Sequence, residues 1–376
     1  MRHDPPRRRC RGRGAAGDPS SSVRPPFVRG STRDDQEPLR RGSKTLIISR
    51  TPLRLSFFGG GTDLRSYYQR RPGRVISTGI GRYLYVIIRE QAEFVQHRYR
   101  INWSRTEFCD EIDEIQNPIA REALRKFRVE RPIELTTFSD IPAGTGLGSS
   151  SAFSVGLVHA LHALNGNQVT KYTLATEAAG IELDVLGRSM GKQDHFAASY
   201  GSFNVYTFNA DETVTVEPVF IDPGVVESLN SSLMLFYIGD QRDASEILKA
   251  QEAATAEKEG VLSAMGDMVD PMVEILSGRG DLSDVGPMLH ESWLLKRSLT
   301  KQISNDRIDE TYRRATGAGA SGGKLVGAGG GGFLMFVVEP DRQEDVATAM
   351  VGIPFVQPPF DTAGSKITYV EPSHVG

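Results

Sequence analysis

The sequence PAGTGLGSSSA, residues 142–152, lies between a predicted strand at 133–138 and a predicted helix at 149–164. The helix follows from apolar residues at helical spacing between Val155 and Leu164. Glycines let a backbone approach an anion closely, and the first turn of a helix offers unpaired N–H groups and a positive dipole end. The segment therefore predicts a phosphate-binding loop. Its serines can cap the helix, and one hydroxyl can bind Mg²⁺.

The same segment also fits a tight turn followed by an N-capped helix, although a turn alone needs fewer glycines and serines. No Lys-Ser or Lys-Thr pair follows the glycines at the required place, which excludes a Walker A loop. The sequence contains neither a His-Arg-Asp nor an Asp-Phe-Gly tripeptide, so we do not expect a protein kinase.

A second glycine segment, RTPLRLSFFGGGTD at 50–63, ends an otherwise apolar strand that begins near Leu46. Arg54 lies within that strand, where an unpaired charge would be costly, so it needs an anionic partner. A phosphoryl group in transfer is one candidate. Asp63 follows three glycines, and it either accepts hydrogen bonds from substrate hydroxyls or forms an Asx turn.

The third glycine segment, 317–332, matches two known patterns that its context excludes. Residues 319–323 fit G-x-S-x-G, but no strand precedes them and the only later His is His374. Residues 327–332 fit G-x-G-x-x-G, but they lead into a strand rather than a helix. We expect this backbone to lie against a substrate, with Lys324 supplying a positive charge.

Composition indicates a soluble globular protein with small-molecule partners. The chain has 376 residues, of which 39% are hydrophobic, and no apolar run approaches the roughly 20 residues of a membrane helix. The formal net charge is −3; residues 1–43 hold eleven Arg against five Asp or Glu, so the remainder carries −9. Such a body gives no general reason to bind nucleic acid or an anionic membrane. The only cysteines, Cys10 and Cys109, exclude a disulfide framework, and a reducing cytoplasm fits.

Three parts are expected along the chain. Residues 1–43 are rich in Arg, Pro, Gly and Ser, so we expect them to be disordered. They are interpreted as an extension without function or a wrongly assigned start, with a nucleic-acid or membrane tail as the minor alternative. The other parts, 44–222 and 223–376, both mix strands and helices, including a helix at 171–186. Pro, Gly, Asn and Ser at 221–231 suggest a domain boundary or a long connection.

In their order and separations, the three glycine segments resemble the three motifs of the GHMP kinases, named for galactokinase, homoserine kinase, mevalonate kinase and phosphomevalonate kinase. The resemblance covers about residues 45–370 and is strongest to the bacterial D-glycero-D-manno-heptose 7-phosphate kinase branch. That branch is indicated by segments 50–63, 117–124, 148–152, 187–203 and 322–332. The resemblance implies an α+β fold of two domains, a ribosomal S5 domain 2-like N-terminal domain and a ferredoxin-like C-terminal domain. It also implies a cytoplasmic enzyme that uses ATP and Mg²⁺ on a sugar or sugar phosphate, with a homodimer allowed.

The resemblance implies roles for individual residues. Those that would wrap the ATP phosphates are Gly144, Thr145, Gly146, Leu147, Gly148, Ser149, Ser150 and Ser151. Mg²⁺ would bind Glu182 and Ser150, with Ser149 as the less favoured hydroxyl. Asp194 would face the attacking hydroxyl, and Arg54 would pair with it and stabilise transferred charge. Substrate contacts would come from Gly60, Gly61, Thr62, Asp63, Lys192, Lys324, Gly329 and Gly330. Galactokinase has Glu-His-Thr-Asp where this chain has Gly-Gly-Thr-Asp at 60–63, so the pocket wall differs.

The resemblance implies a reaction that transfers the γ-phosphoryl group of ATP to the anomeric hydroxyl of D-glycero-D-manno-heptose 7-phosphate, giving the 1,7-bisphosphate. A GHMP kinase of fucose or arabinose type shares most of these motifs. A non-catalytic relative that binds sugar and ATP is disfavoured, because an unused site has no need for such opposed charges. A substrate that already bears a phosphate should require a second basic cluster, with Arg82, Arg188, Lys192 and Lys324 as candidates.

Two further groups have competing interpretations. His159 and His162 are three residues apart on the helix after the loop, where packing is favoured over a metal site because no third ligand is near. Arg242 and Asp243 either face a cleft between domains or form a solvated surface pair.

Overall fold

The computed structural model describes residues 45–92, 94–239 and 244–371, which belong to one compact unit. The predicted extension at 1–43 lies outside the described residues.

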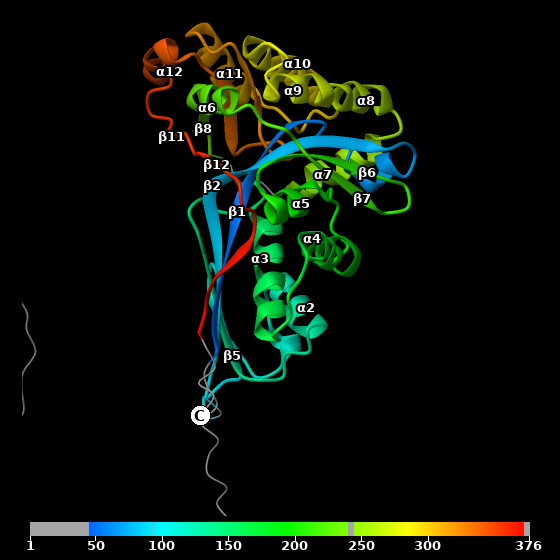
Figure 1. The fold of residues 1–376 in the computed structure, drawn as a ribbon, viewed down its shortest axis with the longest axis vertical. Coiled ribbons are helices and arrows are strands. Elements are labelled where there is room, and N and C mark those ends of the chain that lie inside the picture. Colours follow the sequence, from blue (N-terminus) through cyan, green and yellow to red (C-terminus); the bar gives the residue numbers. More distant parts are fainter. Residues whose placement is uncertain (1–44, 93, 240–243, 372–376) are drawn as a thin grey trace, which may run out of the picture. The chain divides into compact units, whose positions relative to one another are not determined.

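Nine strands of the described chain form a sheet built on two long antiparallel strands, β1 (Leu46–Phe58) and β2 (Gly73–Glu90) (Figure 1). Their sequences are dominated by Ile, Val, Leu, Tyr and Phe, which favour extended backbone. The pairing shifts register after Pro52, which has no N–H to donate to the ladder. The other strands are β3 (Tyr99–Asn102), β4 (Thr106–Cys109), β5 (Ile133–Ser139), β6 (Phe203–Phe208), β7 (Val214–Pro218), β12 (Phe360–Asp361) and β13 (Lys366–Val370).

Helix α3 (Ser149–Leu164) packs against β1 and β2, and its apolar side chains are buried. A Cβ atom at Gly156 would lie 2.9 Å from the Thr51 Oγ1, and Ser49 Oγ donates to the Gly156 carbonyl at 2.7 Å. This close approach fixes the middle of α3 against the first half of β1, and the Arg54 N–H donates to the Leu147 carbonyl at 3.1 Å just before the helix begins. Other helices on the same side of the sheet are α2 (Pro118–Lys126), α4 (Lys171–Gly180) and α5 (Gln193–Tyr200) (Figure 1).

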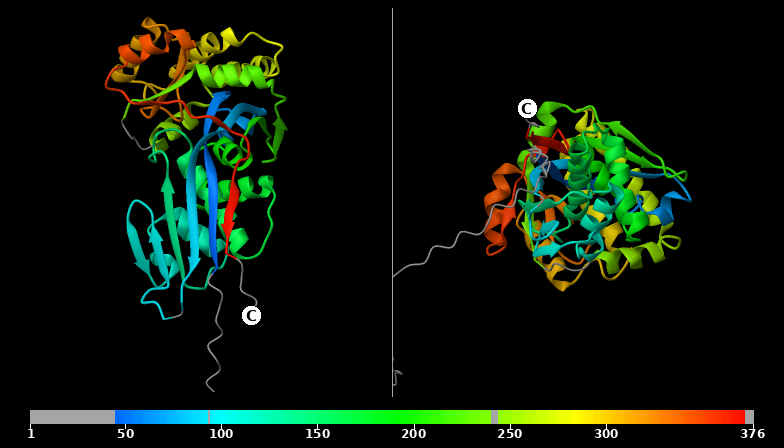
Figure 2. Two further views of the ribbon diagram at one scale, coloured as in Figure 1. Left: turned by 60° about the vertical axis from the view of Figure 1, so that its left-hand side comes forward. Right: turned by 90° about the horizontal axis from the view of Figure 1, so that it is seen from below.

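A second sheet has the antiparallel order β11-β8-β10-β9. Its strands are β8 (Leu233–Tyr237), β9 (Gly322–Leu325), β10 (Phe333–Val337) and β11 (Phe355–Val356). The remaining helices are α1 (Arg65–Tyr68), α6 (Pro223–Ser232), α7 (Ala244–Ala254), α8 (Glu259–Asp267), α9 (Val269–Leu276), α10 (Val285–Arg297), α11 (Asp306–Gly317) and α12 (Gln343–Ala349). The chain then returns to the first sheet, where β13 pairs with β1, seen as red beside blue in Figure 2.

The α+β class is confirmed, and the predicted strand at 133–138 and helix at 149–164 are present. The helix expected at 171–186 instead ends at Gly180 and continues as a π-helical turn, Ile181–Val185. The long connection expected at 221–231 is wrong, because Asp222 caps a helix there and Pro223 occupies its first turn. The strands β12 and β13 come from the second predicted part and pair with the first, and the division after residue 222 stays a prediction.

Candidate active site

The predicted phosphate loop contains three glycines in the left-handed conformation. Gly144, Gly146 and Gly148 have φ values of 76°, 84° and 75°, which other residues adopt only with strain. Gly148 precedes the first turn of α3, and no side chain caps this N-terminus. The first-turn N–H groups can therefore bind an anion. Ser151 is buried in the same turn, and its hydroxyl has no hydrogen-bond partner among the described residues. The loop is therefore suited to binding a phosphate group.

The third glycine segment packs directly on this loop. A Cβ atom at Gly146 would lie 2.5 Å from the Val326 carbonyl oxygen. A Cβ atom at Gly332 would lie 2.3 Å from the Thr145 carbonyl oxygen. Both distances are shorter than real Cβ contacts, so the two backbones approach this closely because both positions lack a side chain.

Arg54 and Asp194 meet at the loop. Asp194 lies in the first turn of α5, and both its oxygens accept hydrogen bonds from the Arg54 guanidinium, from Nε at 2.6 Å and from Nη2 at 2.6 Å. The third guanidinium nitrogen donates to the Gly146 carbonyl at 2.6 Å. Arg54 is only 5% exposed. This bidentate geometry fixes the carboxylate and the guanidinium against the predicted nucleotide loop.

Ser150 and Glu182 present two oxygens to one point. Ser150 Oγ donates to Glu182 Oε2 at 2.6 Å, and the fully buried Glu182 also contacts His195 Nε2 through its other oxygen at 3.1 Å. Arg188 Nη1 donates to Ser150 Oγ at 2.9 Å and to Glu182 Oε2 at 2.5 Å. Burial opposes ionisation of Glu182, but the hydrogen bonds from His195 and Ser150 and the charge of Arg188 lower its pKa below the usual value.

These oxygens fit Mg²⁺. A hydroxyl and a carboxylate are the hard oxygen ligands that this ion prefers, and the remaining positions can be filled by phosphate and water. A positive charge, that of Arg188, already lies between the two oxygens. The π-helical turn Ile181–Val185 carries Glu182 to this position.

Asp63 is held by backbone and amide donors. Its Oδ1 accepts from the Gly61 N–H at 3.0 Å and from Gln193 Nε2 at 3.1 Å, and its Oδ2 accepts from the Gln193 N–H at 3.2 Å. A Cβ atom at Gly191 would lie 1.7 Å from Asp63 Oδ2, so only glycine fits there. Burial and the negative charge of Asp194 raise the pKa of Asp63 to about 6.

One pocket joins Arg54, Asp63 and Asp194. It has an empty volume of about 690 Å³, and Arg54, Asp63 and Asp194 line it together with two buried lysines, Lys296 and Lys324. Other polar or backbone contributors to its wall are Ser56, Gly60, Gly61, Gln193, Gly327 and Ala328. The pocket thus has carboxylates for hydroxyl groups and cations for an anion next to the glycine loop.

Comparison with known proteins supplies the family. Residues 115–202 match the GHMP kinases N terminal domain, and residues 272–356 match the GHMP kinases C terminal domain. Over 318 residues the chain is 30% identical to the D-glycero-alpha-D-manno-heptose 7-phosphate kinase of Campylobacter jejuni, which covers 81% of this chain and 93% of that protein. The chain belongs to the GHMP kinase family.

Other relatives of this GHMP kinase agree. A mevalonate kinase of Pyrococcus horikoshii is 32% identical over 231 residues, which are 60% of this chain and 65% of that protein. The crystal structure of a D-glycero-D-manno-heptose 1-phosphate kinase from Bacteroides thetaiotaomicron matches with a TM-score of 0.70 and 27% identity, over 87% of this chain and 100% of that chain. The GHMP kinase fold and the phosphotransferase class of this enzyme are therefore established.

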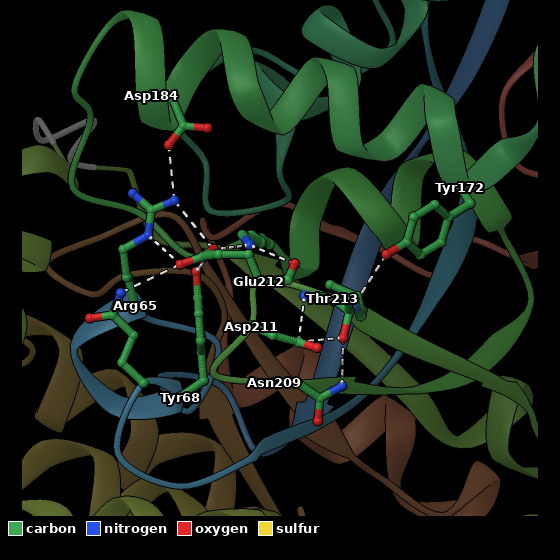
Figure 3. Close-up of polar contacts among 11 residues, drawn as sticks. Arg65, Tyr68, Tyr172, Asp184, Asn209, Asp211, Glu212 and Thr213 are labelled. Carbon is green, nitrogen blue, oxygen red and sulfur yellow. Dashed lines mark hydrogen bonds and ion pairs between the residues drawn. The ribbon is translucent and has the colours of Figure 1, made fainter.

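In this GHMP kinase, Lys192 is directed away from the pocket. Its ammonium group pairs with Glu212 and lies 5.0 Å from the centroid of the Tyr68 ring. Glu212 also accepts from Tyr68 OH at 2.8 Å and from Arg65 Nε at 3.0 Å (Figure 3). Partial burial of Glu212 opposes ionisation, but the hydrogen bonds from Lys192, Tyr68 and Arg65 lower its pKa to about 2. The structure thus places Lys192 in a charged cluster separate from Asp63.

Three other predicted substrate contacts of the kinase have structural partners. The hydroxyl of the buried Thr62 bonds to the backbone of Gly59 in the preceding turn and of Arg74 in β2. The Gly330 N–H donates to the Ile303 carbonyl at 2.9 Å, and a Cβ atom at Gly329 would lie 2.9 Å from the Ile303 Cα. In the third segment the residues that line the pocket are Lys324, Gly327 and Ala328.

Lys296 was not anticipated from the sequence. It lies on α10 and is 7% exposed. A signal was present, since Lys296 follows the buried Trp293 by three residues and Leu289 by seven, which places all three on one helical face. Gln193, which orients Asp63, was missed because the resemblance implied roles for its neighbours Lys192 and Asp194 and none for Gln193.

The two histidines on α3 do not converge on one point. His159 Nδ1 lies 3.0 Å from Ser365 Oγ, and His162 Nε2 lies 2.8 Å from Glu177 Oε2, as expected for helix packing. Arg242 and Asp243 lie outside the described residues. In the part of the chain that the structure describes, no helix has the length and apolar character to span a membrane.

Proposed function

We propose that this GHMP kinase transfers the γ-phosphoryl group of ATP to the anomeric hydroxyl of D-glycero-D-manno-heptose 7-phosphate and releases the 1,7-bisphosphate. One observation carries the proposal. Arg54 binds both oxygens of Asp194 and the carbonyl of Gly146, which places a guanidinium and a carboxylate where the glycine loop meets the pocket. The acceptor is suggested by the Campylobacter jejuni relative, a D-glycero-alpha-D-manno-heptose 7-phosphate kinase.

On the donor side, the N–H groups of the loop and of the first turn of α3 bind the nucleotide phosphates. Mg²⁺ held by Ser150 and Glu182 would neutralise charge on these phosphates. Arg54 stabilises the charge on the oxygens of the transferring phosphoryl group, because its guanidinium is fixed before the substrate arrives.

On the acceptor side, Asp194 accepts a hydrogen bond from the attacking hydroxyl and aligns it with the phosphorus. The hydroxyl oxygen forms the new bond to phosphorus, the bond to the leaving oxygen of ADP breaks, and the hydroxyl proton passes to Asp194 or to solvent. Asp63, ionised above a pH of about 6, accepts hydrogen bonds from other hydroxyls of the sugar.

An ADP-release assay across acceptors tests the proposal. The panel holds D-glycero-D-manno-heptose, its 1-phosphate, its 7-phosphate, fucose and arabinose, and ³¹P NMR identifies the product. The 7-phosphate should give the highest kcat/KM. The 1-phosphate belongs in the panel because a relative of known structure is a heptose 1-phosphate kinase. Fastest turnover of an unphosphorylated sugar would refute the proposed acceptor, and no ADP release with any acceptor would refute the proposed chemistry.

A further inference from the structure

Two buried lysines line the active-site pocket and keep unused hydrogen-bond donors. Lys324 on β9 is 4% exposed and donates to the Phe57 carbonyl at 2.6 Å. Lys296 on α10 donates to the Leu325 carbonyl at 3.0 Å and also to the Gly327 carbonyl. An ammonium group has three donors. Among the described residues, two donors of Lys324 and one donor of Lys296 therefore have no acceptor.

Neither lysine forms an ion pair with a carboxylate of the described chain. Burial, together with the positive charge of Arg54, lowers the pKa of Lys296 to about 7. Burial also lowers the pKa of Lys324 well below its usual value, with added repulsion from Lys296 and Arg54. The other charged groups on the pocket wall are Asp63 and Asp194, and Asp194 is already bound by Arg54. The pocket wall thus holds too little negative charge to keep both lysines protonated, and a bound anion would stabilise their ammonium forms.

Lys296 lies at the nucleotide end of the pocket. It contacts the carbonyl of Gly327, and a Cβ atom at Gly327 would lie 2.5 Å from the Cα of Gly146 in the phosphate loop. The same Gly146 accepts the hydrogen bond from Arg54.

Lys324 lies at the acceptor end. Its partner Phe57 adjoins Ser56, whose hydroxyl donates to Gln193 at 2.7 Å, and Gln193 in turn holds Asp63. The two lysines therefore connect the predicted donor and acceptor positions.

We propose that Lys296 and Lys324 form a phosphate subsite on the wall of this pocket. The inference rests on the proposed function, because it assigns the subsite to the same kinase pocket. Two sources supply the phosphate chemistry: the γ-phosphoryl group of the nucleotide and a phosphate already carried by the acceptor sugar. A phosphate dianion favours the ammonium forms, so its binding draws protons onto the lysines above neutral pH.

Calorimetry on the wild-type enzyme tests this proton uptake. Binding is measured at pH 8.5, where the free phosphate groups are dianionic, in buffers of different ionisation enthalpy. The nucleotide arm compares Mg-ADP with a non-hydrolysable Mg-ATP analogue, and the acceptor arm compares D-glycero-D-manno-heptose with its 7-phosphate. If protons are taken up only when the ligand with the extra phosphate binds, the pair in which this happens identifies which phosphate occupies the subsite. Equal proton exchange within both pairs would overturn the proposal.

Substitution of each lysine tests whether that residue binds the phosphate. Lys296→Met and Lys324→Met remove the charge and keep an unbranched side chain of similar length. Lys301→Met, at an exposed lysine, is the matched control. Each pocket variant should weaken the phosphate-bearing ligand about tenfold and leave its counterpart unchanged, because a hydrogen bond to a charged group is lost. If the pocket variants bind both nucleotides and both acceptors with wild-type affinity, the proposed subsite is refuted. If a variant does not fold, the wild-type calorimetry still decides. The nucleotide arm does not depend on the sugar, so failure of the proposed acceptor is distinguishable from failure of the subsite.

Discussion

Replacement of Asp63 by Asn should stabilise this GHMP kinase at neutral pH and weaken acceptor binding. Asp63 is 3% exposed, and burial together with the charge of Asp194 raises its pKa from 3.8 to about 6. At about 1.4 kcal/mol per pH unit, keeping this carboxylate ionised at pH 7 costs about 3 kcal/mol of folding free energy. Asn removes that cost but turns one acceptor oxygen into a donor opposite Gln193, a loss of about 1 to 2 kcal/mol. The net gain is about 1 to 2 kcal/mol at pH 7.

The shifted pKa of Asp63 determines how the stability difference between wild type and variant changes with pH. The unfolded chain releases the Asp63 proton near pH 4 and the folded chain releases it near pH 6, so the folded state binds the extra proton between them. Wild-type stability therefore falls across this window relative to the Asn variant, and the deficit persists above it. Urea unfolding followed by tryptophan fluorescence at pH 4 and pH 7 measures the difference. The variant should gain stability relative to wild type as the pH rises, while its KM for the acceptor increases.

An exposed carboxylate supplies the control. Asp341→Asn should leave the difference in unfolding free energy the same at both pH values, because Asp341 is exposed. The reasoning about Asp63 is refuted if its Asn variant shows a pH-independent difference from wild type, or if the variant binds the acceptor as the wild type does.

Three further substitutions probe the rest of the site. Asp194→Asn should lower kcat by about 10²-fold or more, since the group that orients the hydroxyl or takes its proton is lost; a nearly unchanged kcat in the ADP-release assay would contradict its role. Arg188→Met removes the cation between Ser150 and Glu182, so the melting temperature without ligand should fall. The rise in melting temperature on adding Mg-ADP should be larger than in the wild type, because Mg²⁺ then replaces the missing charge. An unchanged rise would argue against Mg²⁺ at these oxygens. Lys192→Met should cost up to about 1 kcal/mol of stability, through its partly exposed ion pair and its ring contact, and leave the KM for the acceptor unchanged; a KM raised tenfold would restore Lys192 to the substrate site.

The chemistry of individual residues was readable from the sequence where burial forced a pairing. Arg54 in an apolar strand required an anionic partner, and in the structure that partner is Asp194. The roles of the residues next to Asp194 could not be distinguished from the sequence in this way. Successive side chains in a helical turn point about 100° apart, so Lys192 reaches Glu212, Gln193 reaches Asp63 and Asp194 reaches Arg54. The resemblance implied a substrate contact for Lys192, and its direction within the turn leads instead to Glu212.

The fold was predictable where the signal was local. The loop and helix at 142–164 follow from glycine positions and apolar spacing. Helix α6 was missed although Asp222 and Pro223 are a common helix start, because Pro, Gly and Ser were taken together as loop formers. The pairing of β13 with β1 joins segments from opposite ends of the described chain, and no local pattern reports such a partner.

Steric exclusion explains why three glycine segments far apart in the sequence build one site. A Cβ atom at Gly59 would lie 1.9 Å from the Arg74 carbonyl oxygen, which fixes the turn that leads to Asp63. Gly146 and Gly327 meet where a side chain on either would overlap the other backbone, and that contact brings Lys296 toward the phosphate loop. In each segment the absent side chain admits a neighbouring backbone, and this close packing fixes the position of a charged group that lines the pocket. An alanine at Gly146 should therefore damage catalysis by displacing Arg54, whose guanidinium donates to the Gly146 carbonyl, as well as by distorting the loop itself.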